Sequence, residues 1–242
     1  MVRAKKSYGQ HFLTSKDIAR RIADALTLTG ENPQVLEVGP GQGFLTKYLL
    51  EKKMDLKVVE ADHDMVDHLH KNYIQLHGKV IAEDFLKLDF NHAFPNGQFS
   101  IIGNFPYNIS SQIVFKMLDH RERIPELIGM FQKEMAERII ASPGGKDYGV
   151  ISVLAQAYYE GEYLFSVSNQ HFNPPQSAVR CHPPDLQKRG IDCDPKLFKC
   201  IVKQAFSQCR KMLRNTLNHF FENDYLMNDD YFMKRPKPSV WR

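Results

Sequence analysis

The segment Ile101-Ile102-Gly103-Asn104-Phe105-Pro106-Tyr107-Asn108-Ile109-Ser110 joins a short apolar strand to a helix that is expected to begin at Ser110. The Asn104 side-chain oxygen and a backbone carbonyl beside Pro106 can each accept one N–H, and Tyr107 can stack on the ring that carries the amino group. The segment therefore predicts a site for an exocyclic amino group. Taken alone, it is equally well explained as a strand-to-helix turn with Ser110 as the N-cap.

Three short strands are expected before this segment, at residues 34–38, 56–59 and 80–82, and each is followed by residues suited to a nucleotide. Gly39-Pro40-Gly41-Gln42-Gly43 follows the first strand, and its glycines allow a tight turn and close approach of a ligand. Glu60 follows the second strand, where it can accept both hydroxyls of a ribose. Asp84 follows the third, where it can accept the amino group of adenine. Because parallel strands end at one edge of a sheet, the pattern predicts an adenosine-binding crevice.

The glycine spacing distinguishes between two cofactors that contain adenosine. A dinucleotide site is marked by Gly-x-Gly-x-x-Gly, which lets the pyrophosphate rest on the amino end of the next helix. Here the third glycine, Gly43, comes one residue too early. This favours S-adenosylmethionine, whose amino-acid end is zwitterionic, over NAD. Purely structural explanations exist for Glu60, as a solvated strand end, and for Asp84, as a helix N-cap, but they do not explain why four successive strands end in this way.

Strands alternate with helices from the amino end to about Pro183, which predicts an α/β fold with a parallel, helix-covered sheet of the Rossmann-like type. The first helix is expected to follow Thr14 or Ser15 as its N-cap. Further helices are expected at residues 44–50, 63–77, 133–140 and 150–159, and further strands at 100–103, 127–131, 163–167 and 178–180. This division predicts a Rossmann-like domain at residues 1–183.

From about Pro183 a linker leads into a helical pattern at residues 195–221, which predicts a small all-helical domain at residues 184–242. On a single continuous helix, Lys199, Lys203, Arg210 and Arg214 fall on one side, with apolar residues mostly opposite. The alternative is an interruption at Ser207-Gln208-Cys209.

Composition excludes several classes of protein. The chain has 242 residues, 43% of them apolar, and a net charge of +4, so the distribution of charge matters more than its total. Basic residues concentrate at the amino end and in the last quarter, which indicates a nucleic-acid partner. Four cysteines at irregular spacing indicate reduced thiols and no metal. With no secretory signal and no apolar run that could span a bilayer, we expect a cytoplasmic protein without membrane contact. We also expect it to be a monomer.

The predicted chemistry is methyl transfer to an adenine amino group, which is a poor nucleophile because its lone pair is delocalised into the ring. Accepting both of its hydrogens, at Asn104 and at the carbonyl beside Pro106, rotates the nitrogen toward the methyl group. Proximity then supplies most of the acceleration, at best on the order of 7–11 kcal/mol. The base must be unpaired or flipped, and Tyr107 and Phe172 are the candidate stacking platforms.

Five motifs occur in the order and spacing of one family: Gly9-Gln10-His11-Phe12-Leu13, Glu37-Val38-Gly39-Pro40-Gly41-Gln42-Gly43, Asn104-Phe105-Pro106-Tyr107-Asn108-Ile109-Ser110, Phe172-Asn173-Pro174-Pro175 and Arg210-Lys211-Met212-Leu213-Arg214-Asn215. The chain resembles the KsgA-type ribosomal small-subunit RNA adenine N6,N6-dimethyltransferases over nearly its whole length.

The resemblance implies dimethylation of two adjacent adenosines in a loop near the 3′ end of small-subunit (16S) rRNA, late in subunit assembly. It implies that His11 and Leu13 close over the cofactor. It further implies that Gly39, Gly41, Glu60, Asp84 and Asn104 contact the cofactor. The residues implied to grip rRNA phosphates are Lys203, Arg210, Lys211 and Arg214.

Three departures from the family are present. The segment after Phe172 is shorter than usual, either through a deletion or because residues are missing from the chain. Cys209 stands where the family tends to have an arginine, which weakens the expected grip on rRNA slightly. The family carries a further helix after the equivalent of Arg242, so we expect the small domain to be incomplete by comparison.

Other functions are compatible with part of the pattern. A macrolide-resistance-type enzyme that methylates large-subunit (23S) rRNA shares the fold and a similar Asn-x-Pro-Tyr, although the Gln-His-Phe-Leu and Arg-Lys-x-Leu-Arg-Asn segments favour the small-subunit family. A ribosome assembly factor with little catalysis is a second alternative, which the intact Asn104, Pro106 and Tyr107 disfavour. A DNA adenine methyltransferase is disfavoured because no DNA-reading domain is recognisable.

Overall fold

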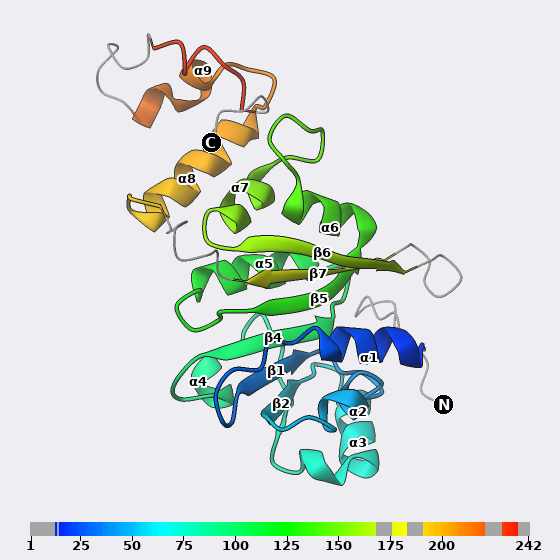
Figure 1. Cartoon of the computed structure of the whole chain (residues 1–242). Helices are drawn as coiled ribbons and strands as arrows, with labels where there is room; N and C mark the ends of the chain where they lie inside the picture. The colour runs from blue at the N-terminus through cyan, green and yellow to red at the C-terminus, as the bar shows by residue number, and fades with distance from the viewer. Residues whose placement is uncertain (1–12, 14, 168–175, 183–190, 221–228, 237–242) are drawn as a thin grey trace. The chain divides into compact units, whose positions relative to one another are not determined.

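The computed structural model describes residue 13 and residues 15–167, 176–182, 191–220 and 229–236. The chain forms two compact units, Met1–Ala136 with Gly161–Pro183, and Glu137–Glu160 with Pro184–Arg242. Figure 1 shows the elements of both units along the chain. Residues 137–160 thus group with the carboxyl-terminal segment. The expected division into functional domains at residue 183 stays a prediction.

The core of the first unit is a seven-stranded sheet with the order β3-β2-β1-β4-β5-β7-β6. The strands are β1 (Gln34–Val38), β2 (Asp55–Val59), β3 (Val80–Ile81), β4 (Phe99–Asn104), β5 (Leu127–Gln132), β6 (Glu160–Val167) and β7 (Gln176–His182). Strands β1 to β5 pair in parallel. The expectation of a wholly parallel sheet is wrong for β7, which runs antiparallel to β5.

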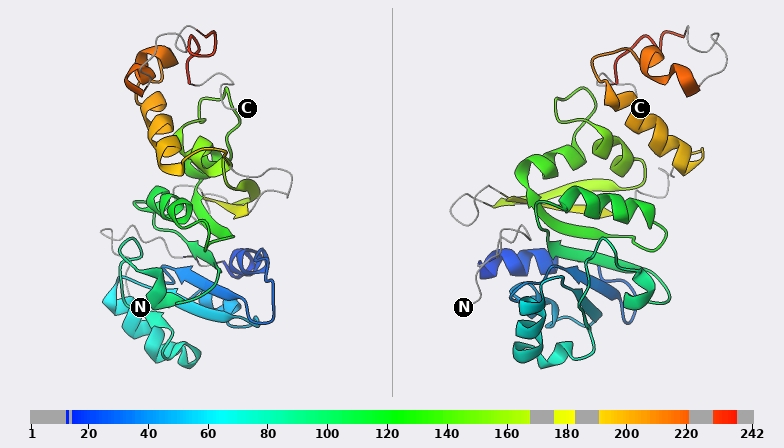
Figure 2. Two further views of the ribbon diagram at one scale, coloured as in Figure 1. Left: turned by 90° about the vertical axis from the view of Figure 1, so that its left-hand side faces the viewer. Right: turned by 180° about the vertical axis from the view of Figure 1, so that it is seen from behind.

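Helices cover both faces of this sheet. They are α1 (Lys16–Asp24), α2 (Thr46–Leu49), α3 (His63–Asn72), η2 (Ile74–Leu76), α4 (Phe90–Ala93) and α5 (Ser110–Asp119). Side chains of α1, α2 and α3 pack with β1, β4 and β5 in one apolar cluster. Figure 2 shows α1 and α5 on opposite sides of the sheet. Their amphipathic sequences place the apolar sides inward.

Most expected elements are present, with differences at their ends. Ser15 caps α1 as expected by accepting the Ile18 N–H. Ser110 is not an N-cap, because Ile109 occupies that position and the Ser110 hydroxyl instead donates to the Tyr107 carbonyl at 3.2 Å. The short helix α4 was not expected from the sequence. Asp89 caps it by accepting the Asn91 N–H.

The ring of Phe105 lies across the backbone of β4 and β5. Gly103 and Gly129 are register partners in these strands. A Cβ on Gly129 would lie 2.0 Å from Phe105 Cε2, and one on Gly103 would lie 2.9 Å from Phe105 Cε1. Phe105 is buried and meets Phe131 edge-on at 5.1 Å between ring centroids. Two paired glycines therefore make the groove in which this ring sits.

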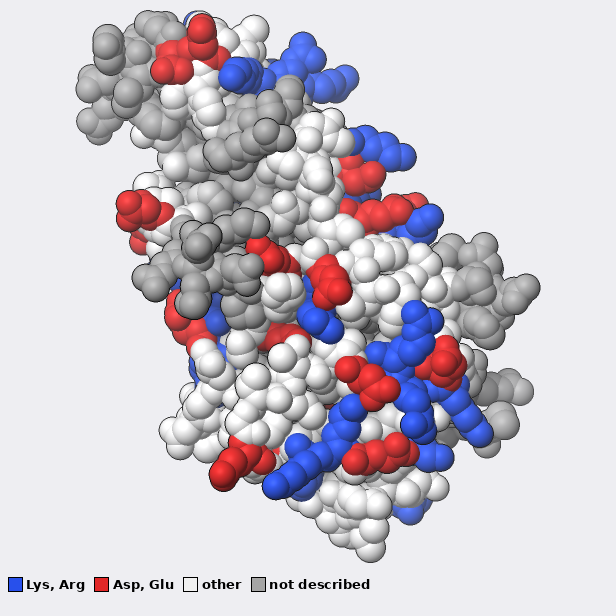
Figure 3. Space-filling model, in the orientation of Figure 1, with Lys and Arg blue, Asp and Glu red and all other residues white. Residues whose placement is uncertain are grey.

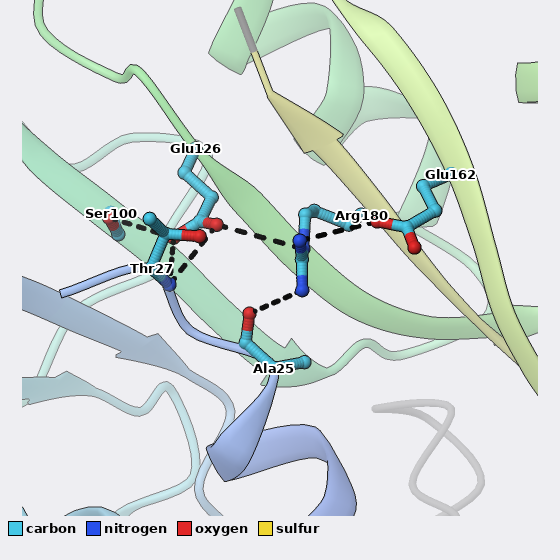
Figure 4. Close-up of polar contacts among 6 residues, drawn as sticks. All are labelled: Ala25, Thr27, Ser100, Glu126, Glu162 and Arg180. Atoms are coloured by element: carbon cyan, nitrogen blue, oxygen red, sulfur yellow. Dashed lines mark hydrogen bonds and ion pairs between the residues drawn. The ribbon is translucent and has the colours of Figure 1, made fainter.

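A polar network near the amino ends of β4 and β5 joins β6 and β7 to the segment after α1. It contains Ala25, Thr27, Ser100, Glu126, Glu162 and Arg180 (Figure 4). Glu126 is buried and accepts the Thr27 N–H at 3.1 Å and the Ser100 hydroxyl at 3.4 Å. Arg180 lies 3.8 Å from Glu126, contacts Glu162 at 3.2 Å and donates to the Ala25 carbonyl at 2.8 Å. The buried carboxylate is thus both hydrogen-bonded and paired with a cation.

The second unit contains α7 (Val150–Gln156), α8 (Pro195–Ser207), α9 (Leu213–Leu217) and η3 (Asn218–Phe220), while α6 (Lys133–Ile140) crosses the boundary between the units. Ala205, Leu213 and Leu217 form the small apolar cluster of the second unit. Because α8 ends at Ser207, the single continuous helix is wrong and the interruption is confirmed. Lys199 and Lys203 lie on α8, whereas Arg210 lies in a turn and Arg214 on α9, so the four do not share one helix face.

We expect Gly129→Ala to destabilise the protein by about 1–3 kcal/mol, the usual cost of overpacking a core. The added methyl group would overlap the Phe105 ring, which has no space to move because it is buried against Phe131. Urea denaturation followed by circular dichroism measures the change. Gly145→Ala is the control, since its Cβ would meet nothing closer than 3.5 Å. Equal stability of the two variants would show that the ring does not depend on this glycine.

Candidate active site

A cavity of about 470 Å³ lies in the first unit, at the carboxyl ends of β1 to β4. Its volume is in the range of small-molecule and cofactor sites. The residues predicted from the sequence that line it are Leu13, Gly39, Gly41, Glu60, Asp84, Asn104 and Pro106. The four successive strand ends therefore converge on one space, as the strand pattern predicts.

The glycine turn after β1 is held in place from outside the cavity. Gly39, Gly41 and Gly43 have φ values of 66°, 55° and 78°, which favour glycine. A Cβ on Gly43 would lie 2.5 Å from the ring of Tyr73. The Tyr73 hydroxyl donates to the Gly43 carbonyl at 2.9 Å. Tyr73 follows α3 and thus fixes the far end of the turn.

The Glu60 carboxylate is bound to the backbone around it. Its Oε2 accepts the Gly41 N–H and its Oε1 accepts the Asp62 N–H, both at 3.0 Å. Burial raises the pKa of Glu60, while the two N–H groups act in the opposite direction. Each carboxylate oxygen has a further lone pair, so both can still accept a ribose hydroxyl.

Asp84 is exposed at the mouth of the cavity, where it opens a turn rather than a helix. Its Oδ1 accepts the Leu86 N–H at 2.9 Å, and its carbonyl accepts the Leu88 N–H at 3.0 Å. This Asx-type turn fixes the carboxylate next to the backbone of the loop. The structural explanation as a helix N-cap is therefore wrong, and the side chain remains accessible from the cavity.

Glu37, the last residue but one of β1, lines the same cavity although no role was predicted for it. It is 1% exposed, and its Oε2 accepts no hydrogen bond from any residue that the structure describes. Burial raises the pKa of Glu37 to about 8, with the Glu60 carboxylate acting in the same direction and Thr46 in the opposite one. A buried acceptor of this kind fits a ligand that brings its own N–H donors.

Asn104 and Pro106 lie at the end of β4 on the side of the cavity next to the glycine turn. The Asn104 side-chain oxygen is buried. Pro106 is adjacent to Gly39, since a Cβ there would lie 3.8 Å from Pro106 Cδ. The Pro106 carbonyl accepts the Ile109 N–H at 3.2 Å and keeps a second lone pair. Two acceptors therefore stand beside the turn.

Tyr107 is half-buried and is not among the residues that line the cavity. Its hydroxyl accepts a hydrogen bond from Gln176 Nε2 at 2.6 Å. Burial raises the pKa of Tyr107, while the hydrogen bond from Gln176 acts in the opposite direction. Gln176 opens β7 opposite Gln132 of β5, so the antiparallel strand anchors this aromatic side chain.

The other predicted site residues lie elsewhere. His11 and Phe172 lie outside the described residues. Lys203, Arg210, Lys211 and Arg214 are exposed in the second unit. Within the described parts of the chain, no three His, Cys, Asp or Glu side chains gather as metal ligands, and no helix has the length and apolar character to cross a bilayer.

Basic residues also gather over α1 and α2, interspersed with acidic ones (Figure 3). Arg20 contacts Glu51 at 3.9 Å, and Lys52 contacts Asp24 at 2.8 Å. Such exposed pairs contribute little to stability, about 0–1 kcal/mol each. They also neutralise part of the positive charge of this face.

Glu37, Tyr73 and Gln176 are residues of the site that sequence reasoning missed. Only Glu37 carried a usable signal, because it precedes the glycine turn at the end of a buried strand. Tyr73 and Gln176 touch the site from segments that lie far along the chain from their partners, Gly43 and Tyr107. No local pattern marks such contacts.

Comparison with known proteins points to one family. A family model described as "Ribosomal RNA adenine dimethylase" matches residues 1–234. The chain is 52% identical over 238 residues to "Ribosomal RNA small subunit methyltransferase A" of Flavobacterium johnsoniae, which covers 98% of this chain and 91% of that protein. The protein of the same name from Parabacteroides distasonis is 52% identical over 244 residues, covering 98% and 90%.

Solved structures agree on the fold. A dimethyladenosine transferase from Plasmodium falciparum superposes with a TM-score of 0.71 at 26% identity, covering 86% of this chain and 74% of that one. The 23S rRNA methyltransferase ErmE superposes with a TM-score of 0.68 at 21% identity, covering 96% and 93%. At that identity, the second likeness shows the fold alone.

Replacing Glu37 with glutamine should remove a pH dependence of stability from the unliganded protein. Because burial raises the pKa of Glu37 from 4.5 to about 8, the folded protein binds this proton more tightly than the unfolded chain does. The resulting stabilisation is complete below the unfolded pKa and is lost as the pH rises through the folded pKa. Relative to Glu37→Gln, the free energy of unfolding of the natural chain should fall by about 3 kcal/mol from pH 5 to pH 8.

Urea denaturation at each pH measures this difference, with Glu31→Gln, at an exposed position, as the control. The control should follow the natural chain across the whole range. If the natural chain and Glu37→Gln showed the same pH dependence, Glu37 would be ionised in the folded protein and its burial would have no effect on its charge.

Proposed function

The chain belongs to the ribosomal RNA adenine dimethylase family and is an S-adenosylmethionine-dependent methyltransferase; we propose that it dimethylates N6 of two adjacent adenosines in a loop near the 3′ end of small-subunit (16S) rRNA. One observation carries the proposal. A single cavity has the glycine turn, Glu60 and Asp84 on its walls, and Asn104 with Pro106 beside the turn. Adenosine-binding groups and amino-accepting groups thus face the same space.

The residues of the cavity fit S-adenosylmethionine, which supplies a methyl group activated by a positively charged sulfur. The backbone of Gly39 and Gly41 allows close approach of the amino-acid end. Glu60 accepts the ribose hydroxyls and Asp84 accepts the adenine amino group. The buried Glu37 Oε2, which no described residue satisfies, is suited to an ammonium group. His11 and Leu13 are proposed to close over this ligand.

Asn104 and Pro106 orient the amino group that becomes methylated. The Asn104 Oδ1 and the Pro106 carbonyl each accept one of its hydrogens, which turns the nitrogen lone pair out of the plane of the ring. No residue needs to remove a proton first, so positioning accounts for most of the acceleration. Tyr107, whose hydroxyl is fixed by Gln176, stacks on the target base, and Phe172 is proposed as a second platform.

The RNA substrate is proposed to be held by exposed basic side chains at residues 184–242. Lys203, Arg210, Lys211 and Arg214 would contact phosphates, which fix position but carry no sequence information. Base specificity would come from the loop itself, since RNA is read mainly at unstacked bases. We place the protein in the cytoplasm as a monomer that acts on the immature small subunit during late assembly.

Two alternatives are less well supported. Methylation of large-subunit rRNA is favoured only by the likeness to ErmE, which at 21% identity carries no argument beyond the fold. The relatives at 52% identity are named for the small subunit. An assembly factor with little catalysis would not need two acceptors beside a cofactor-sized cavity. Determining which subunit RNA accepts the methyl group distinguishes the first alternative from the proposal.

Asn104→Ala should lower the rate of methyl transfer by about 100-fold or more, because it removes a preorganised hydrogen-bond partner of the reacting nitrogen. Immature small subunits and radiolabelled S-adenosylmethionine are the substrates, and primer extension locates the modified adenosines. Urea denaturation followed by circular dichroism shows that the variant is still folded.

Asn96→Ala provides the matched control, since Asn96 is an exposed asparagine in the loop before β4. It should keep the rate of the natural chain. A fully active Asn104→Ala variant would contradict the assigned role. If the natural, folded chain placed no label on the two adjacent loop adenosines, the proposed function as a whole would be contradicted. A variant that binds immature subunits without methylating them would separate an assembly role from catalysis.

A further inference from the structure

Lys116 on α5 fastens the loop that follows β3. Its Nζ donates to three backbone carbonyls of this loop, those of Phe85 at 2.7 Å, Leu86 at 3.2 Å and Leu88 at 2.6 Å. An ammonium group has three donors, and here each has a carbonyl partner. A single side chain thus binds three backbone carbonyls of the loop.

Aromatic rings and acidic side chains surround this ammonium group. Nζ lies 5.2 Å from the ring centroid of Phe85 and 4.7 Å from that of Phe90, within the range of cation–π contacts. Burial lowers the pKa of Lys116, while Asp84, Asp89 and Glu83 act in the opposite direction. The ammonium group is therefore held in place against the loop and is not a freely moving surface charge.

The same loop carries Asp84. Asp84 Oδ1 accepts the Leu86 N–H at 2.9 Å, while Lys116 binds the Leu86 carbonyl. One residue of the loop is therefore held on both sides, by the carboxylate that faces the cavity and by the ammonium group behind it. A shift of the Leu86 backbone would move the Asp84 carboxylate with it.

We propose that Lys116 is a positioning residue that sets the place of Asp84, and through it the affinity and base selectivity for the adenine end of the cofactor. The inference rests on the role given to Asp84 in the proposed function. It adds a connection within the site, because α5 begins at Ser110, directly after the segment that contains Tyr107. The helix that follows the methyl-accepting segment thus also holds the adenine loop.

Lys116→Met tests this proposal, since methionine fills the same apolar path but leaves the three carbonyls without their donor. We expect the Kd for S-adenosylhomocysteine, measured by calorimetry, to rise about 10-fold, which corresponds to about 1.4 kcal/mol. The preference for S-adenosylhomocysteine over S-inosylhomocysteine should fall as well, because the inosine analogue lacks the amino group that Asp84 accepts. Lys116→Arg, which keeps a charged donor, should bind with a Kd between those of the natural chain and the methionine variant.

Lys57→Met is the matched control. Lys57 Nζ donates to the Ala93 carbonyl and lies 5.0 Å from the ring centroid of Phe94, so it makes contacts of the same kind. Neither Lys57 nor its two partners line the cavity. The control should lose stability, as Lys116→Met does, but should keep the affinity and the selectivity for the ligand.

A double-mutant cycle with Asp84→Ala separates positioning from a general loss of stability. If Lys116 acts through Asp84, the two substitutions together should weaken binding little more than Asp84→Ala alone. Additive effects, or unchanged affinity and selectivity in Lys116→Met and Lys116→Arg, would overturn the inference while leaving the proposed function intact. Unchanged binding in Asp84→Ala would overturn the role of Asp84, and with it the premise of the inference.

Should Lys116→Met fail to fold, the arginine variant decides in its place. Binding by Lys116→Arg that is indistinguishable from that of the natural chain, in both affinity and selectivity, would count against the proposal.

Discussion

The placement of Asn104 and Pro106 depends on the Phe105 ring packing against the backbones of two neighbouring strands. The ring is buried over Gly103 and Gly129, whose pairing brings two residues without side chains together in neighbouring strands. A hydrogen bond of 3.2 Å from the Phe105 N–H to the Met130 carbonyl ties the same residue to β5. Asn104 and Pro106 flank this anchored residue, so their acceptors are held by core packing rather than by the loop itself.

Around the cavity, three parts of the site are each fixed by one side chain from a different segment of the chain. Tyr73 holds the glycine turn, Lys116 holds the loop of Asp84, and Gln176 holds Tyr107. In each case a polar group of the holding residue binds a backbone carbonyl or a hydroxyl at the site. Each of these bonds joins segments that are far apart in the chain, so it supplies the rigidity that positioning requires.

Local sequence patterns predict the parts of this structure that depend on neighbouring residues. Short strand patterns, and the residues that follow each strand, predict β1 and the glycine turn. They also predict that Glu60, Asp84 and Asn104 lie close together. The antiparallel direction of β7 does not, because it depends on pairing with β5, which lies far earlier in the chain. Likewise, the sequence around Lys116 indicates only an ordinary helix residue, because its partners lie in the distant loop that precedes α4. Ser110 and the break after Ser207 show that capping and continuity depend on geometry as well as on residue type.

The buried Glu126 carboxylate has a consequence for the order in which the chain becomes stable. Its cationic partner, Arg180, comes much later in the sequence, in the last strand of the sheet to be synthesised. A chain that has emerged from the ribosome only as far as β6 lacks both this counter-ion and the strand that pairs with β5 beside Glu126, so the carboxylate cannot be buried and paired until β7 is present. Co-translational folding of the first unit therefore cannot be completed strand by strand, and its final, cooperative step must await the arrival of β7.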